Sequence, residues 1–145
     1  MKNKILLMFG LLILTFNLAA FEIKIDNAII KSTKPGQTVT AGFMKINSSS
    51  TINIKKIYAE IAGRVEVHTM KMEKGPYGNS IMKMRKIDNP VIFANKEFIL
   101  EPGADHLMIY DIKKQLKSKD NLTLTFIFLD ENKNEFKKNI KFKVY

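Results

Sequence analysis

The side chains with the clearest capacity for chemistry are the histidines and methionines of one central segment. Both histidines, His68 and His106, lie at or beside the ends of a 39-residue stretch, Met70 to Met108, which holds five of the six methionines found after residue 20. The sequence contains no cysteine. Thioether sulfur together with imidazole nitrogen, in the absence of thiolate, is a ligand set suited to Cu(I). The segment is therefore predicted to bind this soft monovalent ion.

The donors fall into three short segments in which they occupy every second position. These segments are residues 68–72, 82–84 and 106–108. Residues at every second position of a β-strand project from the same face of a sheet. Three neighbouring strands, or strand ends, would therefore direct these donors towards a common point. We expect the opposite face to carry Thr69, Lys71, Lys83 and Leu107.

A single ion needs only three or four donors, so these residues cannot all be ligands of one site. The clustering favours as ligands His68, Met84, His106 and Met108. For Met70, Met72 and Met82, packing and a role as alternative ligands are equally consistent with the pattern. Met44 stands alone in an apolar strand, and we expect it to fill the core, as methionine often does.

The donor types favour a carrier over an enzyme. A thiolate would bind Cu(I) tightly but would be prone to oxidation or disulfide exchange outside the cytoplasm. A thioether has no proton to lose and forms no disulfide, while imidazole adds affinity and makes binding weaker in acid. A copper redox enzyme usually has additional nitrogen or oxygen ligands, and two histidines are too few to supply them. We therefore predict a non-enzymatic protein that holds Cu(I) and releases it to a stronger acceptor.

The first twenty residues are typical of a secretory signal peptide. Lys2 and Lys4 precede an apolar run over residues 5–14, and residues 18–20 offer a small-residue cleavage site. The run is short for a membrane span, and without cysteine no lipid anchor is expected. The remaining residues, 21–145, are enough for one domain with a single core. We predict that this domain is exported to the periplasm.

The basic composition leaves a second class of function open. Removing Lys2 and Lys4 lowers the net charge from +10 to +8, and the remaining lysines are spread along the chain. Export argues against nucleic acid as a partner, so a solvated lysine-rich surface is the simpler interpretation. The alternative to a copper carrier is a metal-free exported β-sandwich that recognises a partner protein through this basic surface.

The whole chain after residue 20 reads as short strands separated by turns. Residues 122–128 alternate large apolar residues with threonine and isoleucine, and Pro-Gly turns occur at residues 34–36 and 101–103. A polar segment at residues 130–135 is typical of a hairpin loop between the last two strands. Strands at this regular spacing predict an all-β domain, either a sandwich or a barrel.

Several segments resemble the periplasmic copper chaperone family of the PCu(A)C type, which carries the pattern H-x10-M-x21-H-x-M. In this chain Met84 is followed by 21 residues and then by His106-Leu107-Met108. Residues 65–73, 82–85 and 100–103 also resemble the family, and the similarity extends over nearly all of the chain after residue 20. One difference is that 15 residues, not ten, separate His68 from Met84. The surplus lies around Gly75–Ser80, where we expect an enlarged hairpin.

The resemblance implies a fold, a ligand set and a partner. The expected fold is a cupredoxin-like antiparallel β-sandwich with Greek-key topology. The expected site binds Cu(I) through His68, Met84, His106 and Met108. The expected partner is a copper acceptor, such as the dinuclear copper site of cytochrome c oxidase subunit II, and the expected state is a monomer.

Overall fold

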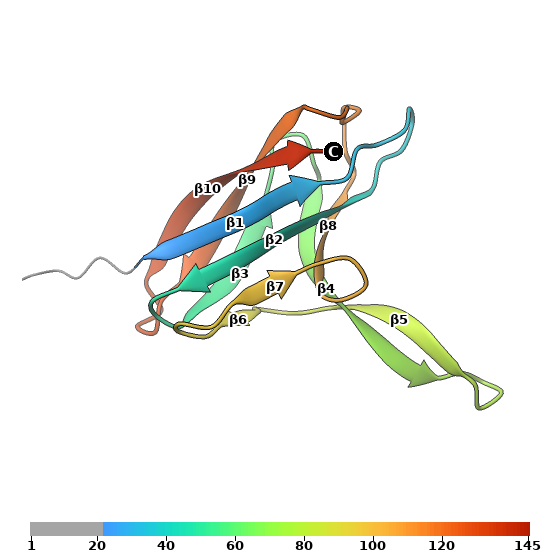
Figure 1. Cartoon of the computed structure of the whole chain (residues 1–145), viewed down its shortest axis with the longest axis horizontal. Helices are drawn as coiled ribbons and strands as arrows, with labels where there is room; N and C mark the ends of the chain where they lie inside the picture. Colours follow the sequence, from blue (N-terminus) through green and yellow to red (C-terminus); the bar gives the residue numbers. More distant parts are fainter. Residues whose placement is uncertain (1–21) are drawn as a thin grey trace, which may run out of the picture.

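The computed structural model describes residues 22–145, and the expected signal peptide, residues 1–20, lies outside them. The described chain forms ten β-strands (Figure 1). They are β1 (Ile23–Ile30), β2 (Thr40–Ser48), β3 (Ile52–Tyr58), β4 (Arg64–Lys74), β5 (Ser80–Lys86), β6 (Val91–Ile92), β7 (Phe98–Leu100), β8 (His106–Tyr110), β9 (Asn121–Leu129) and β10 (Glu135–Val144). Among residues 22–145 we find no helix long and apolar enough to cross a membrane.

The strands form one strongly curved sheet in the order β5-β4-β8-β2-β1-β10-β9-β3-β6, with β7 paired to β2. Strands β3 and β4 also pair, through Ile57 and Val65, so that the sheet folds back on itself around one core. All pairings are antiparallel except β1 with β10, which is parallel. The prediction of an all-β, cupredoxin-like sandwich is confirmed, with this one parallel pair added to the expected antiparallel arrangement.

The core follows from the alternation of apolar and polar residues. On β9, Leu122, Leu124, Phe126 and Phe128 are buried. The Phe126 ring stacks on Phe128, with 5.6 Å between centroids, and on Phe142 of β10 at 6.5 Å. Met44 is also fully enclosed, as predicted. Burying side chains of this size contributes about 1.5–3 kcal/mol each, which is the main stabilisation open to a chain without disulfides.

The β4–β5 hairpin leaves the sandwich and projects away from it (Figure 1). The first half of β4 pairs with β8 up to His68 and His106. Beyond His68, residues 69–74 pair with β5, and a turn containing Gly78 at φ +76° joins the two strands. The loop therefore occupies the Gly75–Ser80 region where the sequence predicts an enlarged hairpin.

Strands β7 and β8 lie end to end along β2. Phe98–Leu100 pairs with residues 44–46, and residues 107–109 pair with residues 40–42. Between them the segment 101–105 bulges outwards in a tight loop, closed by a hydrogen bond from the Glu101 amide to the Asp105 carbonyl at 2.7 Å. Gly103 has φ +82° there, a conformation that favours glycine. This loop leads directly into His106.

Candidate metal site

The two histidines lie directly opposite each other on adjacent strands. His68 of β4 pairs with His106 of β8, and their ring centroids are 6.2 Å apart. Both are buried, although they project from the face opposite the core, because Val67 and Leu107 occupy the core face. Two imidazoles held side by side near the surface are suitable ligands for a metal ion.

One hydrogen bond determines which nitrogen of His106 is free. Its Nδ1 lies 2.8 Å from the Ala104 carbonyl oxygen. A carbonyl only accepts hydrogen bonds, so Nδ1 carries the proton and donates it. In the neutral ring, Nε2 therefore carries a lone pair, which is the form that binds metal ions. The 101–105 loop thus orients His106 as a ligand.

The free nitrogen of His106 faces a methionine sulfur. The Sδ atom of Met84, from β5, lies 3.3 Å from His106 Nε2, so the Met84 side chain reaches across β4. Nitrogen and sulfur ligands of one tetrahedral ion, at bond lengths of about 2.0 and 2.3 Å, lie about 3.5 Å apart. The observed separation is close to this value, and this pair fits a shared metal ion.

The other histidine is held by a carboxylate. His68 Nε2 lies 2.9 Å from Glu66 Oε2, and the carboxylate accepts the ring proton. The second ring nitrogen, Nδ1, is buried and has no hydrogen-bond partner. Buried polar atoms nearly always have a hydrogen-bond partner, so a buried nitrogen without one requires an explanation. A metal ion bound at Nδ1 would provide one.

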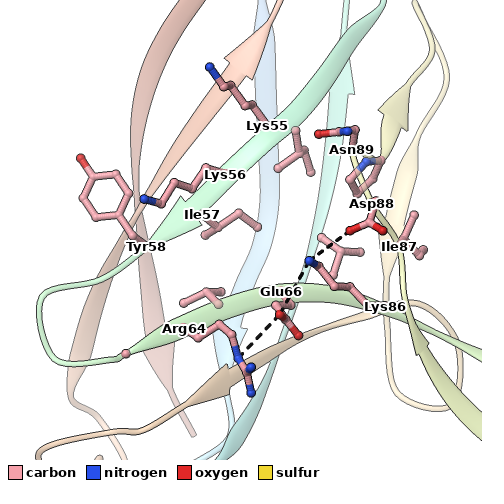
Figure 2. Close-up of a pocket in the computed structure, with 15 residues that line it drawn as sticks. Lys55, Lys56, Ile57, Tyr58, Arg64, Glu66, Lys86, Ile87, Asp88 and Asn89 are labelled. Carbon is pink, nitrogen blue, oxygen red and sulfur yellow. Dashed lines mark ion pairs between the residues drawn. The ribbon is translucent and has the colours of Figure 1, made fainter.

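Glu66 is a residue beside the candidate site that the donor pattern of the sequence does not single out. Its Oε1 atom lies 3.6 Å from Arg64 Nε and 3.9 Å from Lys86 Nζ (Figure 2). A hydrogen bond to Asp88 raises the pKa of Lys86, and the Glu66 charge adds to this. Arg64 and Lys86 thus flank one carboxylate oxygen of Glu66, while the other oxygen accepts the hydrogen bond from His68. The position of Glu66, two residues before His68 on the same strand face, is the signal that could have identified it.

A separate cavity of about 400 Å³ lies where β3 and β4 diverge (Figure 2). Its lining includes Lys55, Arg64, Glu66 and Lys86. None of the predicted ligands lines it. Glu66 is therefore shared between this cavity and the histidine pair, whereas the metal donors lie outside the cavity.

Met108 lies on the same face as the histidines but further along β8. It is opposite Glu66 on β4 and opposite Ala41 on β2. Its side chain is half-buried and lines a hollow beside Lys31 and Thr40. The structure thus brings His68, His106 and Met84 together and places Met108 next along the strand, two residues from His106.

The remaining methionines lie on the hairpin. Met70 is opposite Met84, and Met72 is opposite Met82. Met84 is thus two residue pairs nearer to the histidines than Met82. Thr69, Lys71 and Lys83 lie at the intervening positions and Leu107 is fully buried, as the two-residue spacing predicts. Within residues 22–145, no group of three or more His, Asp or Glu residues is placed to hold a metal ion.

The family of this chain follows from a match over residues 23–140 to the family model described as "Putative lipoprotein LpqE-like". The chain belongs to the LpqE-like family. It has no cysteine that could carry a lipid. Protein RP573 of Rickettsia prowazekii (strain Madrid E), which is uncharacterized, is 31% identical over 90 residues, or 61% of this chain. The matched region spans about half of that relative, 47% of its length.

Solved structures with the same fold include PCuAC domains. The copper-bound PCuAC domain from PmoF2 has a TM-score of 0.61 at 15% identity, covering 85% of this chain and 93% of that domain. The apo PCuAC domain from PmoF1 has a TM-score of 0.58 at 15% identity, covering 85% and 94%. The Cu(I) form of DR1885 from Deinococcus radiodurans has a TM-score of 0.59 at 19% identity, covering 83% and 75%. The LpqE-like chain therefore has the PCuAC fold that the sequence motifs predict.

Proposed function

We propose that this protein is a non-enzymatic carrier of Cu(I). The proposed ligands are His68, Met84, His106 and Met108. The main support is that His106 Nε2 and Met84 Sδ are 3.3 Å apart, beside a His68 ring whose buried Nδ1 has no hydrogen-bond partner. The copper-bound state of the similar PmoF2 domain and the Cu(I) state of DR1885 support copper as the cargo.

The exposure of the site suits transfer better than storage. Both imidazoles are buried, but Met84 is 48% exposed. A ligand from an acceptor protein could replace an exposed thioether without unfolding the carrier. A thioether is also uncharged, so it gives up Cu(I) to a thiolate or a site richer in imidazole.

The proposed location and acceptor come from the sequence. A signal peptide at residues 1–20 would place residues 21–145 in the periplasm as one copper-binding domain, and a family description that refers to lipoproteins supports export. The resemblance to copper chaperones makes the dinuclear copper site of cytochrome c oxidase subunit II the proposed acceptor. The carrier would act as a monomer.

A competition titration with a Cu(I) chelator tests the site. Both His106→Ala and Met84→Leu are expected to weaken Cu(I) binding by at least tenfold, because each removes one donor from a four-donor site. Met44→Leu is the matched control, because Met44 is a core methionine with only 1% of its surface exposed. It should leave Cu(I) affinity unchanged.

The same titration can reject the proposal. If His106→Ala and Met84→Leu bind Cu(I) as tightly as the wild type while remaining folded, the site is wrong. If the wild-type protein binds no Cu(I), the metal-free interaction module becomes the better hypothesis.

A further inference from the structure

The projecting hairpin carries a row of methionines on one face. Met70 faces Met84, and Met72 faces Met82, in two cross-strand pairs separated by the Lys71–Lys83 pair. All four occupy alternate positions of their strands, so they share one face. Only Met84 belongs to the ligand set proposed above.

These side chains are more exposed than packing residues. Met72 is 62% exposed and Met82 57% exposed, while Met70 is half-buried. The hairpin projects from the sandwich (Figure 1), so the core does not account for these residues. Exposed apolar residues that form a contiguous group, and are not scattered singly, mark a functional surface.

The opposite face of the hairpin has a different composition. Arg85 forms a two-fold hydrogen-bonded ion pair with Glu73 at 2.8 and 2.9 Å, and Lys83 lies 3.4 Å from the same carboxylate. The Arg85 hydrogen bond is the main cause that lowers the pKa of Glu73. These ion pairs bridge the two strands on that face, whereas the methionine face carries neutral sulfur donors.

The spacing allows three sulfurs to meet. Directly opposite residues of an antiparallel pair have Cβ atoms about 4.5–5.5 Å apart, and successive residues on one face lie about 6.5 Å apart along the strand. Methionine has three rotatable side-chain bonds, so thioethers on neighbouring pairs can converge. A trigonal Cu(I) site needs only three soft donors.

We propose that Met70, Met72 and Met82 form a second Cu(I) site, made only of thioethers, on the β4–β5 hairpin. It rests on the proposed function for its metal, but it uses none of the four ligands proposed for the histidine site. Met84 lies opposite Met70 and also touches His106, so it adjoins both sites.

The residues around the second site predict its affinity for Cu(I). Lys86 and Lys74 lie at the two ends of the methionine face, in register with His68 and Ser80. No imidazole is among the three donors, and nearby ammonium groups oppose a bound cation. The hairpin site should therefore bind Cu(I) at least tenfold more weakly than the histidine site and load after it.

The test is anaerobic titration of the purified protein with a Cu(I)–acetonitrile complex, followed by chelator competition and X-ray absorption. The wild type is expected to bind two Cu(I) ions per chain, the second with sulfur-only coordination. The double variant Met72→Leu/Met82→Leu should bind only the first ion, because leucine keeps the apolar volume and removes the sulfur. Met44→Leu should still bind two ions.

Two results would overturn this proposal: binding of one Cu(I) by the wild type, or binding of two by the double variant. Binding of one Cu(I) by the wild type is also the result expected if the methionine face serves only to contact a protein. A His68→Ala/His106→Ala variant separates this proposal from the carrier function. If that variant retains the sulfur-only ion and loses the tighter one, both sites stand. If it retains both ions with unchanged affinities, the histidine site fails and the hairpin site stands.

Discussion

Two hydrogen bonds decide which imidazole nitrogens are free in the candidate site. The Ala104 carbonyl accepts from His106 Nδ1, and Glu66 accepts from His68 Nε2. The two rings therefore offer different nitrogens, Nε2 of His106 and Nδ1 of His68. The alternation of donors along the strands indicates which residues share a face, but it contains no information about ring orientation. That orientation depends on contacts the sequence pattern does not show.

Glu66 should matter through His68 and without touching the metal. Glu66→Ala is expected to weaken Cu(I) binding by about 10- to 100-fold, the range typical of residues that orient metal ligands. Glu66→Gln should recover part of the affinity, because an amide oxygen can still accept the His68 proton. Chelator competition gives the affinities.

The matched control for Glu66 is Glu97, a surface carboxylate paired with Lys45 at 3.7 Å. Glu97→Ala should leave Cu(I) affinity unchanged. Equal affinities for Glu66→Ala and Glu97→Ala would show that Glu66 does not orient His68.

At the scale of elements, the proposed donors come from three adjacent strands, β5, β4 and β8, and the loop before β8 orients one of them. The enlarged hairpin is implied by the resemblance to the copper chaperone pattern, because 15 residues in place of ten separate His68 from Met84, and Gly75 and Pro76 place the surplus in a turn. The sequence spacing itself predicts the shared face, through strand periodicity. It leaves open whether Met82 or Met84 is nearer to the histidines. Antiparallel register decides this, and the turn at Gly75–Asn79 fixes that register by pairing Met70 with Met84.

The loop before His106 can be tested by replacing Gly103, with Gly36 as the control position. Gly103 and Gly36 have φ of +82° and +77°, and open space surrounds the position of an added Cβ at each. Replacing either with alanine should lower the free energy of unfolding by about 1 kcal/mol, because an L-residue is strained in this conformation. Urea denaturation measures this loss.

Only the Gly103 change should affect metal binding. Gly103→Ala would shift the Ala104 carbonyl and loosen His106, and so weaken Cu(I) binding, whereas Gly36 lies in the β1–β2 connection, outside the loop that holds His106. Equal Cu(I) affinities in the two variants would argue against a role for the loop in orienting His106.

At the scale of the whole molecule, packing of apolar side chains provides the rigid frame for the site. The chain has no cysteine, so no disulfide can contribute. The alternating apolar residues of β9 and β10 predict the core, since period-two burial needs no long-range information. The parallel pairing of β1 with β10 does need it, because it joins the two ends of the described chain.

The aromatic core should determine stability. Phe142 is fully buried, whereas Phe93 is 57% exposed. Phe142→Ala is expected to lower the free energy of unfolding by about 3–5 kcal/mol, through lost burial and a residual cavity. Phe93→Ala should change it by less than about 0.5 kcal/mol. Urea denaturation of both variants measures the difference, and similar losses would contradict this account of the core.

X-ray absorption on the protein loaded with one equivalent of Cu(I) tests the central claim most directly. We expect a four-coordinate ion with two nitrogen and two sulfur neighbours, supplied by His68, His106, Met84 and Met108. A first equivalent bound by sulfur alone, or by nitrogen and oxygen without sulfur, would contradict it.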